Sequence, residues 1–321
     1  MNHLIKYVSI PKLKPLSNIT IGIPKAMMFY EHGKLWERFF KSLNCKVVSS
    51  GDTNKQILDL GVKYASSETC LPVKVITGHV AMLSSISDYV FVPRYTSTDV
   101  HEYTCPKMCG LPDMIRHSFK NPPSLMEVAV DFNKGDAKTV QSLREISKTL
   151  GCEYNYVSTN FLKTLKDTLK GDMEVSNIET FSQKNKPSIA VLGHPYMIYD
   201  NFLSMNLIQK LKAKDYNVKT PANLTREVKR NNSKPYKDGD YFYGVGFENL
   251  GSAFTFLQDT DLKGIIYLTP FACGIDSLVT EFIEQRLKNN ASIPFMKITV
   301  DEHTGEAGFD TRIEAFLDMI Q

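Results

Sequence analysis

Three cysteines carry the strongest chemical signal in the sequence, because each stands just before an expected helix. Cys105 lies in the stretch Tyr103–Asp113, which follows an apolar run and precedes a short helical pattern, and Cys70 and Cys273 have similar surroundings. Helix N-termini offer unpaired N–H groups and the positive end of a dipole, which stabilise negative charge. Thiolates are soft ligands that suit iron–sulfur clusters. We therefore expect these segments to fold together around one cluster. Three ligands would leave one iron of a four-iron cube open to water or substrate.

The remaining cysteines leave alternatives open. The sequence has no C-x2-C pair, and Cys109 follows Cys105 by four residues. His101, Cys105 and Cys109 could bind zinc from one helix face, but Pro106 argues against a continuous helix there. Cys109 could reach the same crevice as Cys105 only if its loop curls back. Cys45 and Cys152 each follow the end of an expected helix, and packing is the better explanation for both.

Other polar residues could take part in chemistry or serve only the fold. His194 follows an expected strand and could donate a proton to a substrate, or be structural. The loop Asp301–Gly308 clusters three carboxylates with a histidine, and could orient a ligand or partner or form a polar turn. Lys74, Arg94 and Lys107 flank the proposed ligands. They would compensate cluster charge, meet an acidic partner, or be ordinary surface residues.

Composition excludes several classes of protein. The formal net charge of +3 is too small to favour nucleic acid or an anionic membrane. No apolar run approaches the roughly 18 residues of a membrane span, and Lys6 interrupts the short apolar run at the N-terminus, so we expect no signal peptide. We expect a cytoplasmic protein, in which cysteines indicate metal, catalysis or packing and not disulfides. The sequence contains no P-loop motif.

The pattern of elements predicts an α/β fold of two domains, with mainly parallel sheets and helices on both faces. The 321 residues suffice for two such domains. We expect an N-terminal arm at 1–17, a first domain at 18–176, a polar linker at 177–187 and a second domain at 188–321. Expected strands are 18–24, 45–49, 88–93, 125–131, 152–157, 188–195, 264–270 and 294–300. Expected helices are 26–43, 53–64, 72–83, 112–120, 137–150, 160–169, 200–213, 278–287 and 311–320, and the Gly-rich 244–251 is an expected turn.

The position of the cysteines relative to this fold predicts an interdomain site. Ligands of open α/β sheets bind beyond the carboxyl ends of the strands, where Cys105 and Cys273 fall. Cys70 and Cys105 come from the first domain and Cys273 from the second. A cluster that they share would lie in the crevice between the domains, and its assembly would contribute to folding.

Several motifs together resemble the acyl-CoA dehydratase activase-related proteins, from about residue 18 to the C-terminus. The matching stretches are Ile21–Ala26, Glu68–Lys74, Gly78–Val80, Cys105–Lys107, Gly110–Met114, Gly193–Tyr196, Ile198–Asp200, Pro270–Gly274 and Asp301–Gly308. This family is similar to the cluster-binding subunits of 2-hydroxyacyl-CoA dehydratases and to double-cubane cluster proteins. The resemblance implies that Cys70, Cys105 and Cys273 match the family's cysteines, whereas Cys109 takes a position that is usually apolar.

The resemblance also implies a cofactor and partners. It points to a low-potential iron–sulfur protein with two Rossmann-like domains. The expected cofactor is a 4Fe-4S cluster or the larger double-cubane cluster. The expected electron donor is a separate ATP-hydrolysing activator that carries its own cluster. A second dehydratase-like subunit or a homodimer is a further expected partner. The leading hypothesis is a reductase or 2-hydroxyacyl-CoA dehydratase-like subunit. The alternatives are a non-catalytic electron carrier or scaffold and a zinc-stabilised binding protein.

Overall fold

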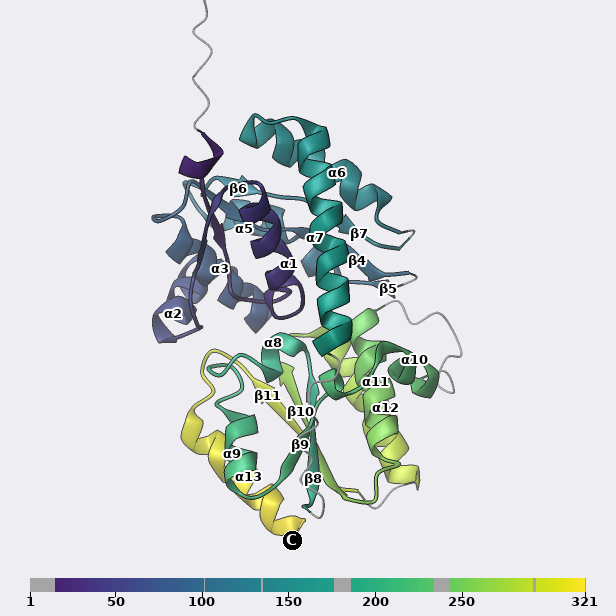
Figure 1. Ribbon diagram of the computed structural model, residues 1–321. Coiled ribbons are helices and arrows are strands. Elements are labelled where there is room, and N and C mark those ends of the chain that lie inside the picture. The colour runs from purple at the N-terminus through teal and green to yellow at the C-terminus, as the bar shows by residue number, and fades with distance from the viewer. Residues whose placement is uncertain are drawn as a thin grey trace, which may run out of the picture.

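The structure, a computed structural model, describes residues 15–100, 102–133, 135–175, 186–233, 243–290 and 293–320. We refer to the described residues up to 175 as the first half and to those from 186 as the second half. Strands and helices alternate and the sheets are mainly parallel, which confirms the predicted α/β fold with Rossmann-like sheets (Figure 1). His101 and most of the predicted arm (1–17) and linker (177–187) lie outside the described residues.

The first half contains a four-stranded parallel sheet and a smaller one. The larger has the order β2 (Lys46–Ser49), β1 (Thr20–Ile23), β3 (Tyr89–Phe91), β6 (Leu125–Met126). In the smaller, β4 (Arg94–Asp99) pairs antiparallel with β5 (Glu102–Tyr103) and parallel with β7 (Ala129–Asp131). The helices are η1 (Leu16–Asn18), α1 (Phe29–Ser42), α2 (Lys55–Tyr64), α3 (Leu71–Leu83), α4 (Pro106–Cys109), α5 (Leu111–Ser118), α6 (Ala137–Leu150) and α7 (Tyr154–Val175).

The second half repeats the strand order of the first. Its parallel sheet runs β9 (Asn217–Lys219), β8 (Ser188–Gly193), β10 (Leu262–Pro270), β11 (Phe295–Val300), so the first strand again lies between the second and the third. The helices are α8 (Pro195–Ile198), α9 (Leu207–Ala213), η2 (Pro221–Asn223), α10 (Arg226–Ser233), α11 (Gly244–Phe256), α12 (Gly274–Asn290) and α13 (Glu306–Met319). This order creates a switch point beyond β8 and β10, where ligands of such sheets bind.

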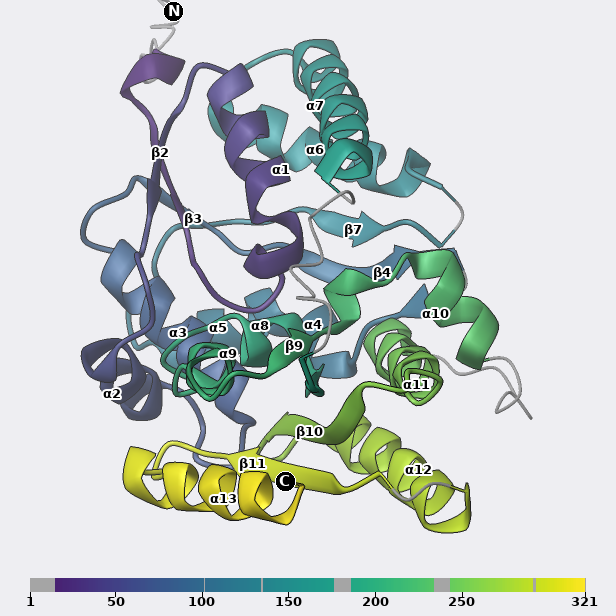
Figure 2. The same ribbon diagram turned by 60° about the horizontal axis from the view of Figure 1, so that its bottom comes forward.

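The alternation of side chains along β8 explains why helices cover both faces of its sheet. Ile189 and Val191 belong to one apolar core, and Ala190 and Leu192 belong to another on the opposite face. Helices α9 and α13 lie on one side of the sheet and α11 and α12 on the other (Figures 1 and 2). A strand buried on both faces reads as a continuous aliphatic run, as Ser188–Gly193 does.

Two expected elements were wrong. Residues 152–157 form no strand, because α7 begins at Tyr154 and turns Val157 and Phe161 into the core at helical spacing. The Gly-rich 244–251 is not a turn but the first part of α11. Its glycine content reflects packing, since a Cβ at Gly251 would stand 1.9 Å from the Lys229 carbonyl oxygen of α10.

Close backbone contact also places α3, which carries Cys70 at its start. A Cβ added at Gly61 of α2 would stand 1.9 Å from the Lys74 carbonyl oxygen, and one at Gly78 of α3 would stand 1.9 Å from the Ile57 carbonyl oxygen. Only glycines at these positions allow the two helices to approach so closely. The crossing therefore fixes the direction in which the N-terminus of α3 points.

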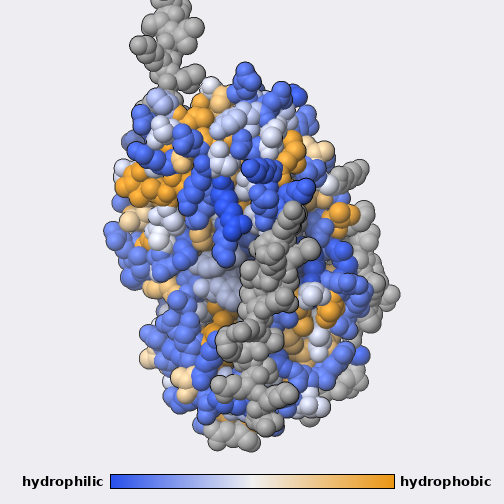
Figure 3. Space-filling view, viewed as in Figure 1, coloured by the Kyte–Doolittle hydropathy of each residue, from blue (hydrophilic) through white to orange (hydrophobic). Residues whose placement is uncertain are grey.

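The two halves are held together by apolar and polar contacts. One apolar core contains buried residues of both halves, and α1 contacts α8. On one side, Tyr30 and Thr53 of the first half donate hydrogen bonds to Asp200 of the second. On another side, Arg226 and Arg230 form ion pairs with Glu102. None of the described helices is both long and apolar enough to cross a membrane, and hydrophilic side chains cover much of the face in Figure 3.

Candidate functional site

A cavity of about 430 Å³ lies between the halves and brings together four of the predicted site residues. Cys70 and Cys105 line it from the first half, and Cys273 and His194 line it from the second. Ligand pockets in proteins typically have about 300–1,000 Å³. Cys109 is not among the described residues that line this cavity, and its Sγ lies 3.5 Å from Thr104 Oγ1.

Each of the three cysteines stands at the start of a helix, as the sequence predicts. Cys70 is the N-cap of α3 and Cys105 the N-cap of α4, and a proline follows in the first turn of both helices. Cys273 directly precedes α12, and its carbonyl oxygen accepts a hydrogen bond from Ser277 N. The three thiols therefore meet at positions where unpaired N–H groups favour negative charge.

The second-half residues of the cavity come from the switch point of the sheet. His194 directly follows β8. Two residues separate Cys273 from the end of β10, the strand that pairs with β8. Unusual backbone conformations mark these turns, with φ of 139° at Gly193 and 62° at Ala272. Met27, beyond β1 in the first half, has φ of 50° and also lines the cavity. Such conformations cluster at ligand sites, where surrounding packing maintains them.

Cys273 forms a compact group with the buried residues His194 and Asp276, and this group could hold a metal ion. One ligand atom from each lies within 4.8 Å of the others. His194 Nε2 lies 3.6 Å from Cys273 Sγ and 3.3 Å from Asp276 Oδ1, and Tyr267 OH donates a hydrogen bond to the same Oδ1 at 2.8 Å. Burial lowers the pKa of His194, but Asp276 and Cys273 outweigh it and raise that pKa well above the usual value.

Tyr196 lies close enough to Cys70, Cys105 and Cys273 for charges on these thiols to affect its pKa. Its ring stacks on His194 with centroids 4.8 Å apart. Burial raises the pKa of Tyr196 well above its usual range, and charges on Cys273, Cys105 and Cys70 raise it further. Burial likewise raises the pKa of Cys105, while the backbone N–H groups of α4 oppose the shift.

The residues present fit an iron–sulfur cluster by their chemistry. Soft sulfur donors converge on a cavity larger than a single ion requires, and helix N-termini surround it. Two buried polar atoms beside it, His194 Nδ1 and Asp276 Oδ2, have no hydrogen-bond partner among the described residues. Buried polar atoms are normally paired, so two unpaired atoms in this group are unusual.

The other cysteines lie elsewhere. Cys45 is buried in the core of the first half and Cys152 packs against the same core, so the packing interpretation is confirmed for both. Residues 102–109 do not form one continuous helix, because β5 ends at Tyr103 and α4 begins at Pro106. The described part of the predicted zinc group therefore does not line one helix face.

The basic residues near the cysteines have internal partners. Lys74 is 3% exposed and pairs with Glu302 of the second half, so the prediction that it meets an acidic partner protein is wrong. Arg94 donates to the Cys109 carbonyl oxygen at 2.7 Å and pairs with Asp113, which fixes the start of α5. Lys107 is half-exposed at the cavity and lies 3.4 Å from the Ala272 carbonyl oxygen.

Within the predicted loop Asp301–Gly308, residues 301–305 form a polar turn that joins the halves, and Glu306–Gly308 begin α13. Asp301 accepts hydrogen bonds from His303 N and the Thr304 hydroxyl, and this turn presents Glu302 to Lys74. The sequence did not single out Asp276 or Tyr196. The available signal was position, because Asp276 lies in the first turn of α12 and Tyr196 two residues beyond His194.

Comparison with protein families gives two matches. Residues 20–224, more than half of the chain, match the model described as "CoA enzyme activase uncharacterised domain (DUF2229)", and residues 250–320 match "2-hydroxyglutaryl-CoA dehydratase, D-component". A comparison with curated proteins gives no match.

The chain is also weakly similar to two solved structures of the SBP FpvC from Pseudomonas aeruginosa, with Ni²⁺ and with Mn²⁺. The identities are 10% and 9%, the matches cover 94% of this chain and 97% and 99% of the FpvC chains, and both TM-scores are 0.27. A TM-score of 0.27 is too low for this likeness to bear on fold or function.

Proposed function

The chain belongs to the CoA enzyme activase domain family, and from this premise we propose that it is an iron–sulfur subunit of an acyl-CoA dehydratase-like system. The match of residues 250–320 to a dehydratase component supports the same assignment. The observation that carries the proposal is the convergence of Cys70, Cys105 and Cys273 on one cavity. These residues lie far apart in the sequence, and packing alone does not require three thiols at three helix starts.

In this proposal Cys70, Cys105 and Cys273 hold the cluster and His194 handles a proton. A bound cluster supplies single electrons at low potential to a substrate beside it. His194 stays protonated near neutral pH, because Asp276 holds its pKa high despite burial. His194 itself lines the cavity, and its buried Nδ1 has no hydrogen-bond partner among the described residues. Met27 and Tyr196 also line the cavity.

Metal analysis of cysteine variants, purified without oxygen, tests the ligand set. Cys70→Ala, Cys105→Ala and Cys273→Ala should each lose most of the iron, the acid-labile sulfide and the EPR signal of the reduced protein. Cys45→Ala is the matched control and should retain all three. Full iron occupancy in the Cys70 or Cys273 variant would defeat the proposal. Loss of iron in Cys109→Ala would instead indicate a four-cysteine site and favour an electron carrier.

A single metal ion bound by His194, Cys273 and Asp276 is a second candidate, favoured by their mutual distances. The two candidates make opposite predictions for two variants. A single ion is lost in Asp276→Asn and kept in Cys70→Ala, and the protein then contains one metal without sulfide. A cluster is lost in Cys70→Ala and kept in Asp276→Asn.

We propose that the electron donor is an ATP-hydrolysing activator that docks near Lys107, the half-exposed lysine at the cavity. Lys107→Glu should slow activator-driven reduction several-fold at low salt, because a like charge at the contact repels an acidic partner. Lys148→Glu, on α6 away from the cavity, is the matched control. Equal reduction rates in the two variants would exclude docking at Lys107.

A further inference from the structure

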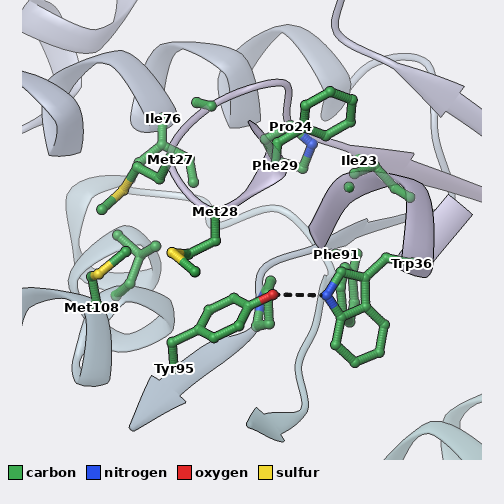
Figure 4. Close-up of a pocket in the computed structure, with 14 residues that line it drawn as sticks. Ile23, Pro24, Met27, Met28, Phe29, Trp36, Ile76, Phe91, Tyr95 and Met108 are labelled. Carbon is green, nitrogen blue, oxygen red and sulfur yellow. Dashed lines mark hydrogen bonds between the residues drawn. The ribbon is translucent and has the colours of Figure 1, made fainter. Parts of the chain in front are cut away.

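A second, smaller cavity adjoins the first and has different walls (Figure 4). Its volume is about 40 Å³, and its lining is almost wholly apolar. Met27, Met28 and Met108 line both cavities and so form the wall between them. Figure 4 shows Met27 and Met108 on one side, and Trp36 and Phe91 on the opposite side.

The polar side chains in the lining of this cavity bind one another and leave little for water. Tyr95 OH accepts a hydrogen bond from Trp36 Nε1 at 2.8 Å and lies 3.0 Å from His32 Nδ1. A stable buried water needs two to four polar partners, and cavities without them stay dry. The cavity therefore suits an apolar group better than water.

The size of the cavity limits what it can hold. One water-sized probe occupies about 10–15 Å³ by the same measure, so 40 Å³ has room for about three such groups. That matches two or three carbon atoms at the end of an alkyl chain. Methionine side chains are unbranched and adaptable, so the wall that they form can open without moving the backbone.

We propose that the small cavity receives the alkyl end of a ligand whose polar part lies in the larger cavity beside the three cysteines. The adjoining position supports this occupant, because a chain that starts near Cys70 and Cys105 meets the methionine wall. This assignment rests on the proposed function in one respect, namely that the ligand is an acyl thioester. The apolar character of the cavity does not depend on that function.

Xenon tests the cavity independently of activity. Crystals of the whole protein under xenon pressure should show xenon between Trp36, Phe91 and the methionine wall. Ala26→Leu fills the cavity and should abolish this site, whereas Ala81→Leu adds the same atoms elsewhere and should leave it intact. Ordered water in the cavity, or no xenon in the unaltered protein, would overturn the proposal without using any variant.

Binding of acetyl-, propionyl-, butyryl-, valeryl- and hexanoyl-CoA tests the occupant. Affinity should rise about fourfold per added methylene and stop rising when the cavity is full. Ala26→Leu should flatten this dependence, and Ile76→Ala, which enlarges the cavity, should move its maximum to a longer chain. Thioester binding that does not depend on chain length overturns the proposal. Xenon binding without any thioester binding overturns the acyl occupant and also contradicts the dehydratase-like function. Loss of iron in the cysteine variants is unaffected by either result.

Discussion

The ion pair between Lys74 and Glu302 should contribute strongly to stability, because it is buried between the halves. The Lys74 side chain is 3% exposed and that of Glu302 is 15% exposed. Removing one partner of a fully buried pair costs about 3–5 kcal/mol. Glu302 retains some contact with water, so we expect Glu302→Gln to cost about 2–3 kcal/mol of unfolding free energy. Lys74→Met should cost less, about 1 kcal/mol, because the remaining carboxylate can turn toward solvent.

The double variant Lys74→Met/Glu302→Gln should be more stable than the sum of the single costs predicts. It leaves no unpaired charge, and a coupling free energy of about 1–2 kcal/mol is expected for groups in contact. Urea unfolding can be followed by far-UV circular dichroism and by fluorescence of Trp36, the one tryptophan, which is buried in the first half. Asp59→Asn, in the exposed pair with Lys55, is the control and should cost less than about 0.5 kcal/mol.

The same pair predicts a dependence on pH. Lys74 holds the pKa of Glu302 below the ordinary glutamate value of 4.5. A lowered pKa in the folded state means that the stabilisation is complete above that value and disappears as pH falls through the folded pKa. Glu302→Gln should remove this part of the acid sensitivity. If Glu302→Gln costs no more than Asp59→Asn at neutral pH, the interpretation of Lys74 as an internal clamp is refuted.

Four further substitutions test the turns and buried polar groups. Gly193→Ala should lower the free energy of unfolding by more than about 2 kcal/mol, because φ is 139° and a Cβ would stand 2.4 Å from the Leu268 carbonyl oxygen. Gly308→Ala, in an open helical position, should instead raise it by about 0.5 kcal/mol. Equal effects of the two variants in urea unfolding would contradict this prediction. Tyr95→Phe should lower the free energy of unfolding by about 1–3 kcal/mol and shift the fluorescence of Trp36, whose buried N–H loses its acceptor. An unchanged emission spectrum would contradict this prediction. Burial lowers the pKa of His79 in the folded state to about 4. As the pH drops, the unfolded state therefore takes up a proton at His79 before the folded state does, and stability should fall between about pH 6.5 and pH 4. His79→Gln should reduce that slope, and an unchanged slope would exclude His79 as its source.

Much of the fold was predictable because apolar runs and helical periodicity report burial directly. The helix Ala137–Leu150 has the predicted bounds, and Ser188–Gly193 forms a buried strand within the predicted range. The errors arose where tertiary contacts override local composition. The stretch that ends at Val157 mixes apolar and polar residues as a strand does, but Val157 is buried as part of a long helix. Gly251 suggests a turn, but it serves a helix crossing that no local pattern reveals.

The convergence of the three cysteines was predictable from the sequence, and their polar neighbours were not. A cysteine before a proline and a helix is visible in the sequence, as at Cys70 and Cys105. The role of Asp276 depends on Tyr267, which lies in β10, and on His194, which directly follows β8. The burial of Lys74 likewise depends on Glu302, 228 positions away. Pairings over such distances follow from how the halves close on each other, and spacing along the chain does not encode them.

The division of the cavity between the halves has a consequence for biosynthesis. Cys70 and Cys105 leave the ribosome well before Cys273, which follows Cys105 by 168 positions. At about 5–20 residues per second, that interval lasts roughly 10–30 s. During this interval the nascent chain contains Cys70 and Cys105 but not yet Cys273. For the first part of the interval it also lacks His194. The three cysteines and His194 are all present only after translation has passed β10, so a metal centre that used all three cysteines could be completed only after that point.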